Sequence, residues 1–233
     1  KTFLAVDMAL HIAAGEPWRD MRTTHGLVIY VAGESASSVR ARVVAFRREH
    51  PDWSNDTPFA VLPHAVNLLD RNAVESLIAA ILEAQSEKSC KVAMIVVDTL
   101  ARAMPGGDEN SARDMGLVVS HADMIRTATG AAVLLVHHTG KDAERGARGS
   151  SALRAAVDAE LFCEATKAQR KVTVTKQRDL EIGLQLPFTL KAVEIGTDSE
   201  TGEPITSCVV LHEKEAQTGR RASDTPQRGP LLR

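Results

Sequence analysis

The sequence predicts an α/β fold in which helices cover both faces of a mainly parallel β-sheet. Three short apolar runs are typical of buried parallel strands, at residues 27–32, 92–97 and 131–136. Segments with apolar side chains at helical spacing lie between these runs, and alternation of this kind predicts a parallel sheet between helix layers. At 233 residues the chain is long enough for one sizeable core.

The elements of the first part follow in order along the chain. Helices are expected at residues 3–14, 35–49, 71–85 and 112–128, because apolar residues recur there every three or four positions. Gly15 is expected to end the first helix, and Asp70 to cap the third. A weak strand is expected at 58–62, and a polar, glycine-rich loop at 105–111.

After Leu153 the sequence no longer alternates between strands and helices. Short strands are expected at residues 159–163, 172–175, 188–195 and 205–212, with a turn at 201–204. We expect them to be antiparallel additions at one edge of the sheet. The resulting domain is expected to cover residues 1–213, and the fading apolar pattern predicts a disordered tail over 214–233.

Composition excludes several classes of protein. With 44% hydrophobic and 25% charged residues, the chain is typical of a globular protein. A net charge of −2 argues against a wholly basic protein that coats nucleic acid, although a locally basic loop remains compatible with it. The aromatic content of 3% argues against nucleic-acid binding by base stacking.

The cysteines and the apolar runs indicate the compartment. Three cysteines without C-x-x-C spacing predict neither a disulfide framework nor a zinc site, and a reducing cytoplasm fits them best: Cys90, Cys163 and Cys208. No apolar run approaches the ~18 residues that span a bilayer. No signal peptide is visible, and the abrupt start at Lys1 suggests that the true N-terminus lies upstream.

Acidic residues follow two of the predicted strands, at the sheet edge where ligands of α/β proteins gather. Asp98 ends the run VAMIVV, which is the Walker B pattern that holds Mg²⁺. Glu34 follows LVIYVAG, where a carboxylate can orient and deprotonate an attacking water. Simpler interpretations stay open. Asp98 taken alone could cap the following turn, and Glu34 taken alone could be a glutamate that stabilises the N-terminus of the next helix.

Lys1 and Thr2 precede the first helix and match the last two letters of G-x-x-x-x-G-K-[ST]. In that motif the lysine meets the β- and γ-phosphates and the hydroxyl binds Mg²⁺. On its own, the pair is better explained as a solvated first turn, and it gains weight only from the other motifs. The glycine half of the motif and its strand are not in this sequence, so the chain as written is not expected to bind ATP normally.

Basic residues and histidines mark the remaining strand ends. His137 and His138 follow AAVLLV, where a histidine can contact a γ-phosphate and a nucleic-acid-binding loop. The next segment, 140–154, is glycine-rich and basic, which suits contacts to a phosphate backbone. Lys176 and Arg178 end the run KVTVT, and a guanidinium there could neutralise a transferred phosphoryl group. Each feature has an alternative explanation. The histidines could be a surface pair without a role, and the segment 140–154 an ordinary solvated loop. The basic residues after KVTVT could protect an edge strand against aggregation.

Six short motifs occur in one order: KT, AGE, VVDTL, VHHTGK, RGSSAL and TKQRD. In this order the chain resembles the RecA-like ATPases that include the plasmid replicative helicase RepA and, more distantly, DnaB-type helicases. The resemblance covers about residues 1–180, which is most of the predicted domain. Each motif is weak by itself, and their order and spacing carry the resemblance.

The resemblance implies a role for each matching residue. Lys1 and Thr2 would hold phosphates and Mg²⁺, Asp98 would be the Walker B aspartate, and Glu34 the catalytic glutamate. His138, with His137 beside it, would sense the γ-phosphate or DNA. Lys176 and Arg178 match a K-x-R that reaches into the site of the adjacent subunit, and Arg148 is a second candidate for phosphate or inter-subunit contact. The RepA branch carries its finger arginine a little beyond RGSSAL, where this chain has Val157 and Asp158, so Arg178 is the preferred finger.

The implied function is Mg²⁺-dependent ATP hydrolysis in a homo-oligomeric ring, expected to be a hexamer, that acts as a DNA helicase in replication. Single-stranded DNA would contact the loop at 139–149, and no membrane is involved. Two alternatives remain: a RecA- or RadA-like ATPase that binds DNA without unwinding it, and a non-catalytic oligomerisation module. A kinase is less favoured, since it predicts a lid instead of the His-His and K-x-R strand ends. The central expectation is that Thr2, Glu34, Asp98 and His138 converge on one triphosphate.

Overall fold

The computed structural model describes residues 1–54, 56–138, 151–166 and 169–213. Within them a four-stranded sheet has the order β2-β1-β3-β4, and every neighbouring pair is parallel. Its strands are β1 (Leu27–Ala32), β2 (Phe59–Leu62), β3 (Val92–Asp98) and β4 (Ala132–Val136). The predicted α/β class is therefore confirmed, with the strands close to the predicted ranges.

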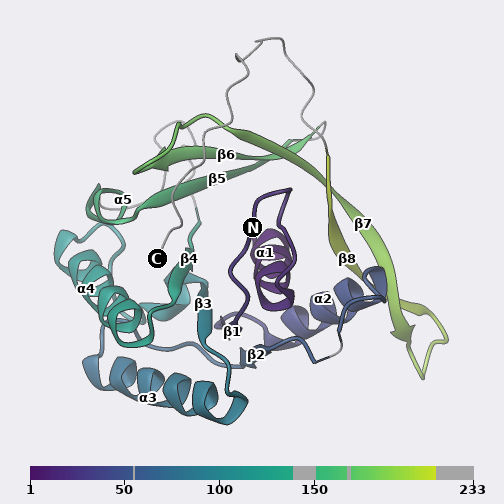
Figure 1. Ribbon diagram of the computed structural model, residues 1–233, viewed down its shortest axis with the longest axis horizontal. Coiled ribbons are helices and arrows are strands. Elements are labelled where there is room, and N and C mark those ends of the chain that lie inside the picture. Colours follow the sequence, from purple (N-terminus) through teal and green to yellow (C-terminus); the bar gives the residue numbers. More distant parts are fainter. Residues whose placement is uncertain (55, 139–150, 167–168, 214–233) are drawn as a thin grey trace.

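Helices cover both faces of this sheet (Figure 1). They are α1 (Thr2–Ala14), α2 (Ala36–Glu49), α3 (Arg71–Lys88), α4 (Ala112–Thr129), the short α5 (Ser151–Ala156) and the 3₁₀ turn η1 (Leu100–Ala103). One core joins α3 and α4 to Ile95 and Val97, and another joins α1 and α2 to Met94 and Val96. Successive residues of β3 thus serve opposite cores, as the two-residue period of a strand requires.

Local signals in the sequence fix the ends of these helices. Asp70 caps α3 by accepting a hydrogen bond from the Asn72 N–H at 3.0 Å, as predicted. Gly15 ends α1 with a φ of 74°, a left-handed conformation that glycine adopts without strain. Helix α3 continues beyond its predicted end at Gln85 and ends at Ser89, which also has the left-handed backbone conformation.

The strands of the second half form a sheet of their own. It has the order β5-β6-β7-β8, all antiparallel, and consists of β5 (Ala159–Ala165), β6 (Arg170–Gln177), β7 (Gln185–Thr197) and β8 (Pro204–His212). The antiparallel pairing agrees with the prediction. The expected attachment to the edge of the first sheet does not occur among the described residues, where these strands pair only with one another.

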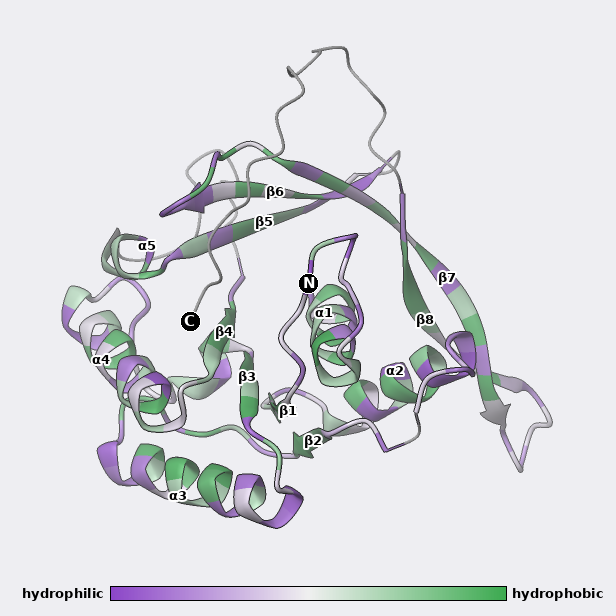
Figure 2. Cartoon of the chain, in the orientation of Figure 1, coloured by the Kyte–Doolittle hydropathy of each residue, from purple (hydrophilic) through white to green (hydrophobic). Residues whose placement is uncertain are grey.

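Helix α1 lies between the two sheets (Figure 1). Leu4 and Trp18 pack against Val172, Phe188 and Val210 of the antiparallel sheet, while the next side of α1 packs on the parallel sheet. In Figure 2, much of α1 and of β4 carries the colour of hydrophobic residues. Burial of both sides of α1 explains why its apolar residues are not confined to one narrow stripe.

Three parts of the predicted organisation lie outside the described residues. They are the tail from residue 214 onward, the predicted DNA loop at 139–149 and, within it, Arg148. Among the helices that the structure does describe, none combines the length and the apolar character needed to cross a bilayer.

Candidate active site

Candidate residues collect where the parallel strands end. Glu34 lies two residues beyond β1, Asp98 is the last residue of β3, and His137 and His138 follow β4. Because all three strands are parallel, these positions share one edge of the sheet. The backbone N–H of Gly33 donates to the Asp98 carbonyl at 2.7 Å, which joins the ends of β1 and β3 directly.

Asp98 is almost completely buried, with 4% of its surface exposed. Ala32 pairs with Asp98 and Tyr30 with Val96, so Tyr30 and Asp98 point to the same face of the sheet, the one that α1 and α2 cover. The Tyr30 hydroxyl donates to Asp98 Oδ2 at 2.6 Å. Burial, followed by the Asp98 charge, raises the pKa of Tyr30 well above its usual range, so the phenol stays protonated and donates.

The second oxygen of this carboxylate, Asp98 Oδ1, is buried without a hydrogen-bond partner among the described residues. A buried carboxylate oxygen without a partner is costly, and a hard divalent cation is a ligand that compensates it. Thr2 begins the helix that covers the same face of the sheet. Asp98 Oδ1 is therefore an oxygen of the kind that Mg²⁺ binds, and Thr2 stays a predicted second ligand.

Glu34 lies in a different environment, with 48% of its side chain exposed. The Thr99 hydroxyl donates to Glu34 Oε1 at 3.1 Å, and His138 Nε2 lies 3.9 Å from the same oxygen. Glu34 is thus held from one side while its carboxylate remains open to water. The strand ends therefore present one buried carboxylate that suits a metal ion and one exposed carboxylate that suits the acceptance of a proton from water.

The start of α1 is tied to the end of β4. Lys1 Nζ donates to the His137 carbonyl oxygen at 2.8 Å. Burial lowers the pKa of Lys1 from its ordinary value, and the nearby Cys163 opposes this effect. Glu109 Oε1 lies 3.8 Å from His137 Nδ1. The structure therefore places Lys1 beside the strand-end residues and adds a carboxylate, Glu109, that the sequence motifs did not single out.

Lys176 and Arg178 lie at the end of β6. Lys176 Nζ donates to the carbonyl oxygens of Arg154, Ala155 and Val157 at 2.5, 3.0 and 2.7 Å. This ammonium caps the C-terminal end of α5, where helix carbonyls lack partners and favour a cation. These contacts lie within its own chain, and the expected contact of Lys176 with another subunit stays a prediction.

Arg178 differs from Lys176 in that 60% of its side chain is exposed. Its guanidinium contacts Asp158 at 3.0 Å, and Asp158 is itself 73% exposed. An exposed ion pair of this kind contributes little to stability and is easily exchanged for another partner. Arg178 is therefore the member of the K-x-R pair that is able to contact a neighbouring protein.

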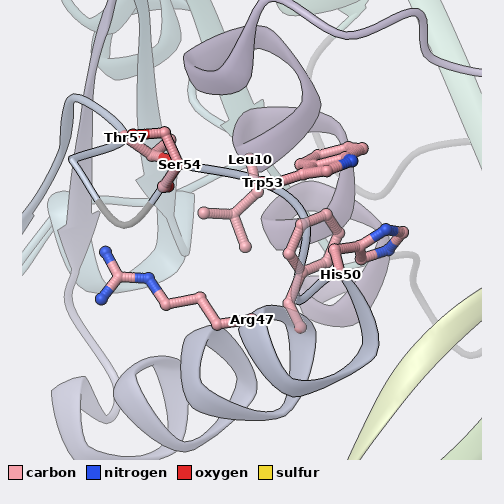
Figure 3. Close-up of a pocket in the computed structure, with 7 residues that line it drawn as sticks. Leu10, Arg47, His50, Trp53, Ser54 and Thr57 are labelled. Atoms are coloured by element: carbon pink, nitrogen blue, oxygen red, sulfur yellow. Dashed lines mark hydrogen bonds between the residues drawn. The ribbon is translucent and has the colours of Figure 1, made fainter.

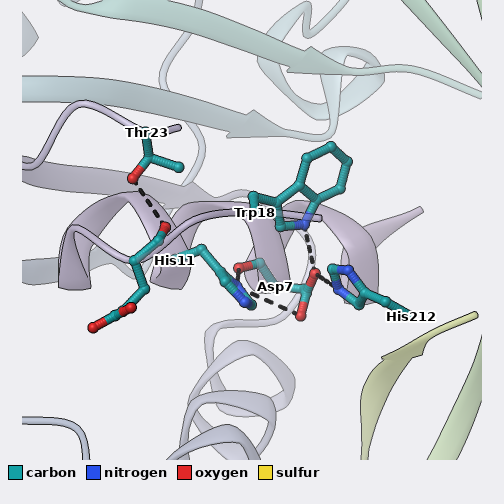
Figure 4. Close-up of polar contacts among 6 residues, drawn as sticks. Asp7, His11, Trp18, Thr23 and His212 are labelled. Atoms are coloured by element: carbon teal, nitrogen blue, oxygen red, sulfur yellow. Dashed lines mark hydrogen bonds and ion pairs between the residues drawn. The ribbon is translucent and has the colours of Figure 1, made fainter. Parts of the chain in front are cut away.

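A second polar cluster lies farther along α1 (Figure 4). Asp7 Oδ2 accepts from Trp18 Nε1 and from His212 Nε2, both at 2.7 Å, and His11 Nδ1 donates to the Asp7 carbonyl at 2.8 Å. The ligand atoms of Asp7, His11 and His212 lie within 4.8 Å of one another, as in a metal site. Hydrogen bonds between these groups already occupy the same atoms, so the cluster is explained as a network that ties α1 to β8.

A small hollow beside this cluster is lined by Leu10 and by residues of α2 and the segment after it (Figure 3). The His50 ring lies tilted against the rings of Phe46 and Trp53, with centroids 4.3 and 4.4 Å from its own. The lining contains no carboxylate and no residue from the strand ends. It therefore lacks the groups expected of a site for a magnesium nucleotide.

Comparison with known proteins agrees with the geometry of the strand ends. Residues 1–144, more than half of the chain, match the family described as AAA domain. A search of curated proteins finds no match. The matched region contains α1 and all four parallel strands, and with them Lys1, Glu34, Asp98 and His138. The chain belongs to the AAA domain family of P-loop ATPases.

Proposed function

We propose that the protein hydrolyses ATP at the edge of the parallel sheet, between Asp98 and Glu34. The observation that carries this proposal is the contrast between the two carboxylates: Asp98 is buried with one unpartnered oxygen, and Glu34 is open to water. Phosphoryl transfer to water requires both a metal-binding carboxylate and a group that orients and deprotonates the nucleophile. Adjacent strands supply these two groups here.

Each residue of the site has a task in this reaction. Glu34 accepts the proton of the attacking water, and the Thr99 hydroxyl keeps the carboxylate in place. Lys1 places a positive charge beside the phosphates, and Asp98 with Thr2 holds the metal. Mg²⁺, when bound, neutralises charge on the β- and γ-phosphate oxygens. Arg178, exposed at the end of β6, adds charge from a neighbouring protomer, as arginine fingers do.

We further propose that this ATPase is a ring-forming DNA helicase of the replicative type, as a hexamer. His138 supports this reading, because it lies 3.9 Å from Glu34 and directly precedes the basic, glycine-rich segment 139–149. A histidine in that position can link the state of the γ-phosphate to a segment that contacts single-stranded DNA. The three free cysteines fit a reducing compartment, and we place the protein in the cytoplasm.

The alternative is a RecA- or RadA-like ATPase that binds DNA without unwinding it, which uses the same strand-end residues. A forked-duplex assay on the full-length protein separates the two. Strand separation that requires ATP supports a helicase. Hydrolysis stimulated by single-stranded DNA without strand separation supports the alternative, because the fold alone does not determine what the motor does.

The hydrolysis proposal is tested with Glu34→Gln in the full-length protein. Loss of the base is expected to lower the rate of hydrolysis by about 10²- to 10⁴-fold while nucleotide binding is retained. Glu83→Gln is the matched control, since Glu83 is an exposed glutamate of α3. Unchanged turnover in Glu34→Gln, or an equal loss in the control, would remove Glu34 from the mechanism.

A further inference from the structure

Tyr30 combines complete burial with a polar contact to the candidate metal ligand. Its exposed fraction is 0%, and its surroundings in the core between α1 and the sheet are largely apolar, including Val28, Val96 and Ala5. A buried hydroxyl is costly unless it forms a hydrogen bond, and phenylalanine would supply the same apolar contacts. The hydroxyl therefore requires an explanation beyond packing.

The contact between Tyr30 and Asp98 leaves the two carboxylate oxygens in different situations. Oδ2 accepts the phenol proton at 2.6 Å, whereas Oδ1 has no partner among the described residues. A hydrogen bond to one oxygen restricts rotation of the carboxylate about its last side-chain torsion. It also leaves Oδ1 as the oxygen that no described residue hydrogen-bonds.

We propose that Tyr30 is a positioning residue that presents Asp98 to Mg²⁺ through Oδ1 alone. The inference rests on the proposed ATPase function, because it takes Asp98 as the metal-binding carboxylate. Groups that hydrogen-bond to a metal ligand orient it, and their loss typically weakens metal affinity by about 10- to 100-fold. Tyr30 is the only tyrosine in the sequence, so no other phenol can replace it.

The test is Tyr30→Phe in the full-length protein, which removes one oxygen and keeps the ring. Mn²⁺ binding in the presence of a non-hydrolysable ATP analogue is titrated by electron paramagnetic resonance, so the readout does not depend on turnover. We expect Mn²⁺ affinity to fall about tenfold or more. Binding of the analogue in excess EDTA should remain as in the wild type.

A second variant separates this proposal from the function on which it rests. Asp98→Asn removes the ligand charge and should abolish most of the Mn²⁺ binding. If Asp98→Asn binds Mn²⁺ as well as the wild type, the metal assignment fails and the proposed function fails with it. If Asp98→Asn loses binding and Tyr30→Phe retains it, only the positioning role of Tyr30 is overturned.

Thr99→Val is the matched hydroxyl control, because Thr99 donates to Glu34 and not to Asp98. It should slow hydrolysis while Mn²⁺ affinity stays within about twofold of the wild type. An equal loss of Mn²⁺ affinity in Thr99→Val and Tyr30→Phe would mean that any lost hydroxyl disturbs the site. That result would overturn the specific role of Tyr30.

Discussion

Replacing Asp7 with alanine removes the acceptor at the centre of the network between α1, the Trp18 segment and β8. Asp7 is 3% exposed, and its Oδ2 accepts two hydrogen bonds of 2.7 Å, from Trp18 Nε1 and His212 Nε2. In the variant both donors lose this partner, and the Trp18 indole is itself buried. The substitution therefore removes two charge-assisted bonds at once.

The size of the effect follows from these two contacts. A hydrogen bond to a charged group contributes about 1.5–3 kcal/mol, so the pair predicts a loss of about 3–6 kcal/mol in the free energy of unfolding. This is a large fraction of the roughly 5–15 kcal/mol that stabilises a typical domain. Asp7→Asn keeps an oxygen that can accept from both donors, and we expect it to lose less than half as much.

Urea denaturation of the wild type and both variants, followed by circular dichroism, measures the difference. The predicted order of stability is wild type, Asp7→Asn, Asp7→Ala. The free energy contributed by one ordinary hydrogen bond is about 1 kcal/mol. If the free energy of unfolding of Asp7→Ala differs from that of the wild type by less than this, the network does not stabilise the fold. An equal loss in the two variants would show that charge, and not the accepting oxygen, is what matters.

Three further predictions concern pH and the end of β6. Burial is the main cause that lowers the pKa of His11 and His50 from 6.5, so below that pH the unfolded chain binds more protons than the folded one. Stability should therefore fall as pH drops through about 6.5, and His11→Asn should flatten the profile of melting temperature against pH. Lys176→Met should lower the free energy of unfolding by about 1–3 kcal/mol, because it removes the donor to three carbonyls. Chemical denaturation measures this loss, and an unchanged denaturation midpoint would contradict the prediction. Arg178→Ala should change stability by less than about 1 kcal/mol, since its ion pair is exposed, yet reduce hydrolysis by about 10³-fold or more. A normal rate in Arg178→Ala would rule out its role as the finger.

The parallel half of the fold was predictable because its signals are local. The runs that form β1 and β3 are continuous and apolar, and Asp70 and Gly15 mark helix ends through their own side-chain and backbone chemistry. The separate antiparallel sheet was not predicted, because its position depends on packing between Leu4 and residues such as Phe188, far apart in the sequence. Alternation within a strand indicates its faces but not its partner sheet.

The site shows the same division between local and distant information. Glu34, Asp98 and His138 could be proposed from the sequence because each follows an apolar run at a strand end. Tyr30 was missed because it lies inside such a run and resembles any other buried strand residue, while its partner Asp98 is 68 positions away. The contacts of Lys176 with its own chain were missed because no helix was expected at α5, whose six residues supply carbonyls that it binds.

A crystal structure of the full-length protein with Mg²⁺ and a non-hydrolysable ATP analogue would test the central claim most directly. We predict that the metal lies nearest Asp98 Oδ1 and that the carboxylate of Glu34 faces the γ-phosphate. A nucleotide bound elsewhere, with Asp98 and Glu34 both remote from its phosphates, would contradict the account.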